Sequence, residues 1–383
     1  MSSLNYLVVG GGILGSAIAE RLAVRGFAVT LLDGDTGETS ATVRTFGWIN
    51  DAGINIPEYS ALRTVGKLAL AQRRIQDDEQ GRSSTWYHQS GRLDWESADG
   101  RQELPAHQDA HRETIREEAL RLSSQGQDAY VIAAGQIDRY DPTLDPATVE
   151  GDVLWVPEDA WVDLPAFADE LRKQAVRAGG RIVRGKAESL LVADDGTVRG
   201  VRLDDGSELT ADRTIVAAGE QTVALVRSVI SIPSASTTGV TVITEPLSVV
   251  PRTILRAPFA GARPDEQGRL VIVADPLEDA VGEDRVVPSD VLERTLAHIS
   301  SFLKGRPKLK AEQVQVGVRP IPGDGLPVVG AVPGTDGSLA VAFTHSGATV
   351  GYALARILVD ELIDGHRAHV LSAFRPERFS KEA

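Results

Sequence analysis

Three glycines near the start of the chain, Gly10, Gly12 and Gly15, have the spacing of a turn that binds the pyrophosphate of a dinucleotide. In such a turn Gly10 allows a tight bend, Gly12 lets the pyrophosphate approach the backbone, and Gly15 lets a helix pack closely on the preceding strand. The amides at the helix N-terminus then bind phosphate oxygens. Asp33 would accept hydrogen bonds from the adenosine ribose and repel a 2′-phosphate. The spacing predicts a dinucleotide site without distinguishing FAD from NAD.

The elements that this turn requires stand around it in the sequence. Residues 6–9 are an apolar, β-branched run that predicts a buried strand, and apolar residues at helical spacing follow until Gly26. Residues 27–32 predict a second strand, which Asp33 ends. The cofactor contacts predicted in this unit are Gly10, Gly12, Ile13, Leu14, Gly15, Asp33 and Gly34.

Residues 165–219 predict a return to the nucleotide-binding fold. An amphipathic helix over 165–178 is followed by two Asp-Gly pairs, at 195–196 and 205–206, set between alternating apolar runs. They predict an antiparallel meander that leads into an apolar strand over 214–218. NAD-binding domains usually connect their parallel strands by helices, so the meander favours a flavoprotein.

Other elements are expected on both sides of this region. Helices are predicted over 59–80 and 108–124, and strands on both sides of Ser90-Gly91. Near the C-terminus, residues 339–343 predict a buried strand, 344–348 a loop, and 349–363 a helix with one apolar face. This second strand, loop and helix would present backbone amides to a ligand, in the manner of the first.

Four segments of the chain resemble the D-amino-acid oxidase superfamily, which includes glycine oxidase, monomeric sarcosine oxidase and bacterial D-amino-acid dehydrogenase. They are the N-terminal glycine motif, "VLWVPEDAWVDLPAF", "ADRTIVAAG", and "VGVRPIPGDGLPVVGAVP" with the following "GSLAVAFTHSGATVGYALARILVDELI". The resemblance implies an α/β fold, with a Rossmann-like FAD-binding domain of the glutathione-reductase type that carries a β-meander, and an antiparallel-sheet α+β substrate domain. It places the FAD-binding domain in residues 1–85, 150–225 and 315–383, and the substrate-binding domain in 86–149 and 226–314.

The resemblance also implies roles for individual residues. Further FAD contacts are expected at Ser40, Ala41, Thr42, Arg44, Ala187, Ala218, Gly219, Gly347, Ala348 and Thr349. Arg319, in the G-x-R-P motif, would pair with the substrate carboxylate, a task that suits its planar fork, and Arg44 and Trp48 are further substrate-binding candidates. Arg44 could face the flavin, the phosphates or the substrate. His345 is the second catalytic candidate, although hydride transfer from a neutral amine requires no acid or base.

Composition narrows the partners that are expected. The net charge of −14 and a pI near 5.0 argue against nucleic acid. The chain has no cysteine, and no histidine precedes His88, so FAD is expected to be bound without a covalent link; no metal is expected. Neither a membrane span nor a cleavable leader is recognised, which favours a cytoplasmic protein. The oligomeric state is left open.

The function that follows is FAD-dependent oxidation of a carboxylate-bearing amine, either glycine, an N-substituted glycine or a D-amino acid. Hydride would pass to flavin N5, the imine would hydrolyse, and O2 would be reduced to H2O2. The glycine or sarcosine oxidase type is the first expectation, and a biosynthetic oxidase for a bulky N-carboxymethyl amine is a variant of it. The alternatives are a D-amino-acid dehydrogenase that reduces a quinone or carrier, an NAD-dependent dehydrogenase, and a flavin-binding redox sensor without turnover.

Overall fold

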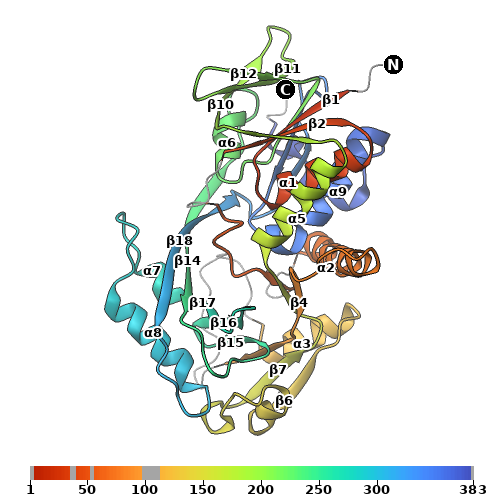
Figure 1. The fold of residues 1–383 in the computed structure, drawn as a ribbon. Helices are drawn as coiled ribbons and strands as arrows, with labels where there is room; N and C mark the ends of the chain where they lie inside the picture. The colour runs from red at the N-terminus through yellow and green to blue at the C-terminus, as the bar shows by residue number, and fades with distance from the viewer. Residues whose placement is uncertain (1–3, 35–39, 52–55, 97–112, 381–383) are drawn as a thin grey trace.

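The computed structural model describes residues 4–34, 40–51, 56–96 and 113–380, and its two large sheets lie at opposite ends of the molecule (Figure 1). The six-stranded sheet has the order β19 (Val328–Ala331), β20 (Leu339–Phe343), β13 (Arg213–Val216), β1 (Asn5–Val9), β2 (Ala28–Asp33) and β9 (Arg181–Arg184). Its strands are parallel except β19, which runs antiparallel to β20.

Helices cover one face of this sheet and the predicted meander covers the other. The helices are α1 (Ile13–Val24), α5 (Leu164–Arg177) and α9 (Gly347–Asp364), and α2 (Pro57–Glu79) packs against α9. The meander is β10 (Ala187–Val192), β11 (Val198–Leu203) and β12 (Glu208–Thr210), with α6 (Gln221–Val226) beside it. Successive residues of β1 alternate between the two cores: Val8 packs under the helices, and Leu7 and Val9 pack under the meander.

The eight-stranded sheet forms the other half of the molecule. Its order is β18 (Ala311–Pro322), β14 (Ser234–Thr244), β17 (Leu270–Ala274), β16 (Ala260–Pro264), β15 (Ile254–Ala257), β5 (Arg92–Trp95), β7 (Asp152–Val156) and β6 (Tyr130–Ala133). Neighbouring strands are antiparallel except β15 and β5. One face packs against α4 (Ile137–Tyr140), α7 (Asp275–Asp279) and α8 (Ser289–Ser301). The long strand β18 extends from this sheet towards the six-stranded sheet (Figure 1).

Smaller elements connect the two halves. A three-stranded sheet contains β3 (Trp48–Ile49), β8 (Ala160–Val162) and β4 (Tyr87–Gln89), and α3 (Ile115–Ser124) packs on β7. Short 3₁₀ segments cover Ala134–Gln136, Pro146–Thr148, His369–Phe374 and Pro376–Phe379. Within the described ranges, no helix has both the length and the apolar character needed to cross a membrane.

A buried ionic cluster joins α2 to its neighbours. The guanidinium of Arg73 bonds to the carboxylates of Glu20 at 3.0 Å and Asp77 at 2.9 Å, and also to Tyr352 and Gln174. These carboxylates and the hydroxyl of Tyr352 hold the pKa of Arg73 above its ordinary value against the effect of burial. Because these residues come from α1, α2, α5 and α9, the cluster fixes the helical layer.

Most of the elements expected from the sequence are present, including the meander with left-handed glycines at 196 and 206. The predicted helix over 108–124 begins at Ile115, because Thr114 and Glu117 form a capping box; residues 108–112 lie outside the described residues. The strands on both sides of Ser90-Gly91 join different sheets, β4 pairing with β8 and β5 with β7 and β15. The division into two discontinuous domains stays a prediction.

Candidate functional site

The glycine turn between β1 and α1 is sterically closed to larger residues. Gly10 has φ +114°, and a Cβ atom on it would lie 2.4 Å from the carbonyl oxygen of Ala217. A Cβ atom on Gly15 would lie 1.8 Å from the carbonyl oxygen of Gly10. Gly12 stands immediately before α1, and Oγ1 of Thr42 lies 3.0 Å from the position of a Cβ atom on it. Ile13 and Leu14 begin the helix, so the predicted turn and helix N-terminus are in place.

Asp33 ends β2 next to this turn, with Gly34 following it. A Cβ atom on Gly11 would lie 2.2 Å from the carboxyl carbon of Asp33, so the middle glycine of the run is also required. The guanidinium of Arg184 donates to Oδ2 of Asp33 at 2.7 Å. Neither Gly11 nor Arg184 is expected from the spacing, although the run of three glycines was a signal for Gly11.

Residues 40–44 connect the glycine turn to the eight-stranded sheet. The amide of Ile13 donates to Oγ1 of Thr42 at 3.1 Å, and the amide of Thr42 donates to Oγ of Ser40 at 3.3 Å. Two residues further, Arg44 donates from Nη1 to the carbonyl oxygen of Val316 in β18. Ser40, Ala41 and Thr42 therefore lie at the N-terminal end of α1, whereas the side chain of Arg44 lies against β18.

The remaining cofactor candidates near the six-stranded sheet lie at the carboxyl ends of its strands or just beyond them. Ala218 and Gly219 follow β13, and the Cα atom of Ala218 is 2.8 Å from the position of a Cβ atom on Gly10. Ala187 begins β10, three residues after β9 pairs with Asp33. Parallel strands bring these residues to one edge, which is where open α/β sheets bind ligands.

Helix α9 begins at the same edge, after β20. The amides of Thr349 and Val350 already donate to the carbonyl oxygen of Ser346, so the amides of Gly347 and Ala348 are the ones that open the helix. The hydroxyl of Thr349 lies 3.5 Å from the carbonyl oxygen of Trp48 and 3.4 Å from the amide of Asn50. Thr349 therefore ties α9 to β3 through its side chain.

His345 lies in the loop between β20 and α9. Its ring meets the ring of Tyr59 edge-on, with centroids 6.3 Å apart, and Tyr59 packs in turn on Phe374. Burial raises the pKa of Tyr59, so its hydroxyl stays protonated. These contacts explain how the half-buried imidazole is oriented and favour a positioning role for it in the loop.

Arginine side chains lie on the face of the eight-stranded sheet that is opposite its apolar core. Arg256 and Arg263 lie there on β15 and β16, and the ring of Trp48 lies 5.1 Å from the guanidinium of Arg256. Arg263 is buried against the rings of Trp161, at 4.3 Å, and Phe46, at 5.7 Å, and burial lowers its pKa to about 10. Phe46 and Trp48, which follow the segment bonded to the start of α1, therefore lie over this arginine-bearing face.

Glycines make room on this face for Arg44 and Arg319. Gly239 of β14 pairs with Gly317 of β18, and the side chain of Arg319 lies over Gly239, its Nε 3.0 Å from the position of a Cβ atom. The side chain of Arg44 lies over Gly317 in the same way, with its Cβ atom at 3.3 Å. The structure thus brings two of the predicted substrate-binding arginines to adjacent positions; Trp48 lies farther across the face, where it also donates to Asp159 at 3.0 Å.

The guanidinium of Arg319 has an internal partner that the sequence did not predict. It pairs through both terminal nitrogens with the carboxylate of Glu278 in α7, and Nη1 lies 2.8 Å from Oε2. The Arg319 side chain remains 42% exposed, while Glu278 is only 13% exposed. The predicted carboxylate clamp therefore already binds a carboxylate of its own chain.

Asp275 lies beside this pair. It follows β17 directly, and its Oδ2 atom is buried with no hydrogen-bond partner in the part of the chain that the structure describes. Burial and the nearby carboxylate of Glu278 raise the pKa of Asp275 to about 7, partly opposed by Arg256 and Arg319. Asp275 and Glu278 both belong to the sequence "ADPLEDA", in a segment that contains no motif from which a site residue was predicted.

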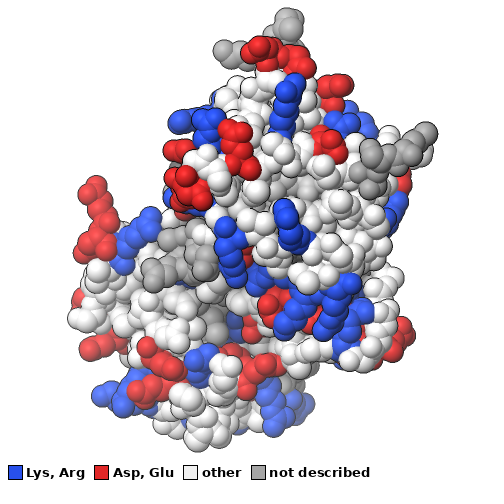
Figure 2. Space-filling view, turned by 45° about the horizontal axis from the view of Figure 1, so that its top comes forward, with Lys and Arg blue, Asp and Glu red and all other residues white. Residues whose placement is uncertain are grey.

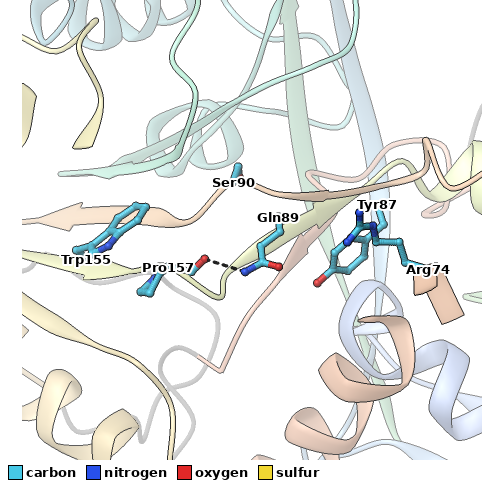
Figure 3. A pocket seen from close by; sticks show the side chains of 6 residues that line it. All are labelled: Arg74, Tyr87, Gln89, Ser90, Trp155 and Pro157. Carbon is cyan, nitrogen blue, oxygen red and sulfur yellow. Dashed lines mark hydrogen bonds between the residues drawn. The ribbon is translucent and has the colours of Figure 1, made fainter. Parts of the chain in front are cut away.

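One surface cavity is lined by other residues. A cavity of about 450 Å³ is lined by Arg74, Tyr87, Gln89, Ser90, Trp155 and Pro157 (Figure 3), none of which is a predicted site residue. Acidic and basic side chains are interspersed over the face of the molecule shown in Figure 2. Among the described residues, no three His, Asp or Glu side chains are grouped so as to hold a metal.

The fold and this edge define a dinucleotide-binding α/β protein with a second, largely antiparallel sheet. The chain belongs to the family of FAD dependent oxidoreductases known as DAO, whose profile matches residues 5–361. FAD is thus its cofactor, and the closed glycine turn with Thr42 at the start of α1 fits a pyrophosphate. NAD-dependent dehydrogenation, the alternative from the glycine spacing, is set aside.

Individual relatives agree with this family. The bifunctional protein ThiO/ThiG of Trichormus variabilis is 24% identical over 399 residues, covering 99% of the chain and 56% of the relative, so the chain spans about half of that protein. The uncharacterized oxidoreductase YurR of Bacillus subtilis is 27% identical over 397 residues, covering 97% of the chain and 98% of YurR. The crystal structure of iminodiacetate oxidase (IdaA) from Chelativorans sp. BNC1 superposes with a TM-score of 0.81 at 21% identity, covering 97% and 98% of the two chains.

Proposed function

We propose that this protein oxidises a carboxylate-bearing amine, either glycine, an N-substituted glycine or a D-amino acid, with FAD as oxidant and O2 as the final acceptor. The name of one structural relative agrees with such a substrate, since iminodiacetate is an N-carboxymethyl glycine. A biosynthetic oxidase for a bulkier N-carboxymethyl amine belongs to the same proposal. Reduction of a quinone or carrier in place of O2 is the alternative.

One observation carries the proposal. Thr42 accepts a hydrogen bond from the first residue of α1, and Arg44, two residues later, lies against β18, the strand that carries Arg319. One short segment thus contacts both the proposed cofactor-binding turn and the strand of the proposed carboxylate-binding guanidinium. A redox sensor has no need of such a guanidinium, so this juxtaposition favours an enzyme.

The residues proposed to hold FAD divide by the part of the cofactor they meet. The glycine turn with Ile13 and Leu14 would bind the pyrophosphate together with Ser40, Ala41 and Thr42, and Asp33 and Gly34 would lie at the ribose. Ala187, Ala218 and Gly219 would line the adenosine side, and the amides of Gly347 and Ala348 would face the flavin ring. When bound, FAD accepts the hydride that leaves the α-carbon of the amine.

The chain's own groups bind and orient the substrate. Arg319 would hold the substrate carboxylate in a bidentate pair, and Trp48 would form part of the apolar wall. The amine must lose its proton before oxidation, and the resulting imine is hydrolysed by water. His345 would keep the loop before α9 in shape.

An anaerobic titration tests this proposal. The visible spectrum of the FAD-loaded protein is recorded before and after addition of N-methylglycine, glycine or D-alanine, and the flavin bands should bleach with at least one of them. Admission of O2 should then restore the bands and release H2O2. Bands that persist with every carboxylate-bearing amine would contradict the proposed substrate class, and bleached bands that O2 does not restore would favour the dehydrogenase.

A further inference from the structure

We propose that Glu278 is a specificity-determining residue that occupies the Arg319 clamp in the empty site, so that a substrate carboxylate binds only by displacing it. This inference rests on the proposed function, because it takes Arg319 as the group that receives the substrate carboxylate. It adds a second side chain, from a different element, that decides which carboxylates reach the clamp.

The geometry of the pair supports displacement. Glu278 engages both terminal nitrogens of Arg319, which is the same fork that a substrate carboxylate would use. The two bidentate contacts cannot coexist on one fork. Since the Arg319 side chain is 42% exposed, an incoming anion can still approach the guanidinium while Glu278 is in place.

The anchoring of α7 indicates which part moves. Leu277, the neighbour of Glu278, is completely buried in the apolar core beneath the sheet. The backbone of α7 is therefore held, and Glu278 can leave Arg319 by rotation of its own side chain. The negative charge of Glu278 then remains near Arg319. It repels the carboxylate of a ligand, so a ligand binds well only if it makes further favourable contacts.

The charges around the pair make this competition selective. Asp275 and Asp279 lie on the same helix as Glu278, and Arg256 faces Asp275 from β15. A simple carboxylate must overcome both the Glu278 contact and this acidic surrounding. An amino acid also presents an ammonium group, which the same acids favour, so it is expected to bind where an ordinary organic acid does not.

Binding to the FAD-loaded protein tests the role of Glu278. Propionate supplies a carboxylate alone, and 2-methylalanine supplies a carboxylate and an amine but has no α-hydrogen to be removed. Both are titrated by flavin difference spectroscopy and by calorimetry into wild type, Glu278→Gln, Arg319→Met and the double variant. Glu283→Gln, an exposed neighbour in the segment after α7, is the matched control.

Loss of a charged, bidentate competitor should tighten the binding of propionate by about tenfold in Glu278→Gln, with a similar or smaller gain for 2-methylalanine. The gain should vanish in the double variant, and the control should bind as wild type does. Unchanged propionate binding in a folded Glu278→Gln protein would overturn the proposal, as would weaker binding of 2-methylalanine, which would make Glu278 a partner of the amine.

Two further outcomes separate this inference from the proposed function. If Arg319→Met binds both ligands as wild type does, Arg319 is not the clamp and both proposals fail. If Arg319→Met abolishes binding but Glu278→Gln changes nothing, the clamp stands and only the role of Glu278 is refuted. Should Glu278→Gln not fold, Glu278→Asp, which keeps the charge but shortens the reach, should give a smaller gain in propionate binding.

Discussion

Replacement of Asp275 by Asn should stabilise the protein in a pH-dependent manner. The carboxyl of Asp275 is half-buried and one of its oxygens has no hydrogen-bond partner within the described residues, so the ionised form is poorly solvated. Its pKa rises from the ordinary 3.8 to about 7. Well below pH 3.8 the group is protonated whether the chain is folded or not, and it does not affect folding stability. As the pH rises towards 7, the unfolded chain ionises first, and folding stability falls.

The size of this effect follows from the two pKa values. The difference between 3.8 and about 7 corresponds to a loss of at most about 4 kcal/mol, complete above pH 7. About one third of that loss has already occurred at pH 5. Because Asp275 is only half-buried, we halve the remainder for solvent screening. The advantage of Asp275→Asn over wild type should therefore grow by about 1 to 2 kcal/mol between pH 5 and pH 8.5.

Urea unfolding of both proteins at the two pH values measures this difference, with FAD at the same saturating concentration throughout. Comparison with wild type cancels the titration of all other groups. Asp279→Asn is the control for the removal of one charge from the same helix, since Asp279 is exposed. An advantage for Asp275→Asn that is equal at both pH values, or that shrinks at pH 8.5, would refute the reasoning.

Three other substitutions test the cofactor turn, the clamp and the helical layer. Gly15→Ala places a Cβ atom 1.8 Å from a backbone oxygen and should lower the FAD retained per protein at least about tenfold by flavin absorbance, whereas Gly135→Ala, with open space around it, should not. Arg319→Met should weaken 2-methylalanine binding by at least about 30-fold, and a change below threefold with normal FAD content would contradict the clamp. Arg73→Met removes the ion pair of the buried Glu20 carboxylate and one of the partners of Asp77, and it should cost about 3 to 5 kcal/mol in urea unfolding; Arg74→Met, at an exposed pair, should cost less than about 1 kcal/mol.

Local patterns in the sequence predict the cofactor side of the molecule well. The glycine turn, the meander and the strand, loop and helix near His345 are each written in fewer than about 40 consecutive residues, and turn chemistry and hydrophobic periodicity determine such units. Thr114 shows the limit of this approach, since its capping box sets the start of α3 more precisely than the charge pattern did. The ion pair between Asp33 and Arg184 depends on the pairing of β2 with β9, which lie far apart in the sequence.

The substrate side could not be predicted, because it depends on the register of strands that are distant in the sequence. Arg319 lies over Gly239 only because β14 pairs with β18 so that Gly239 opposes Gly317. Glu278 reaches Arg319 only because β17, which leads into α7, pairs with the side of β14 that is opposite β18. A shift of one residue in the pairing of β14 with β18 would turn the arginine to the apolar face. The motif around Arg319 therefore predicted the position of a guanidinium but not its ion pair with Glu278.

The segment from Ser40 to Trp48 makes the two sides interdependent. Thr42 is bonded to the first turn of α1, Arg44 lies on the glycine of β18 next to Arg319, and the ring of Trp48 lies near Arg256. These contacts fall within seven residues, so the backbone has little freedom to satisfy one and lose the others. Cofactor binding at Thr42 would therefore set the position of Arg44, and through it the space left beside Arg319. Under the proposed function, this one segment would couple the loading of the cofactor to the shape of the substrate site.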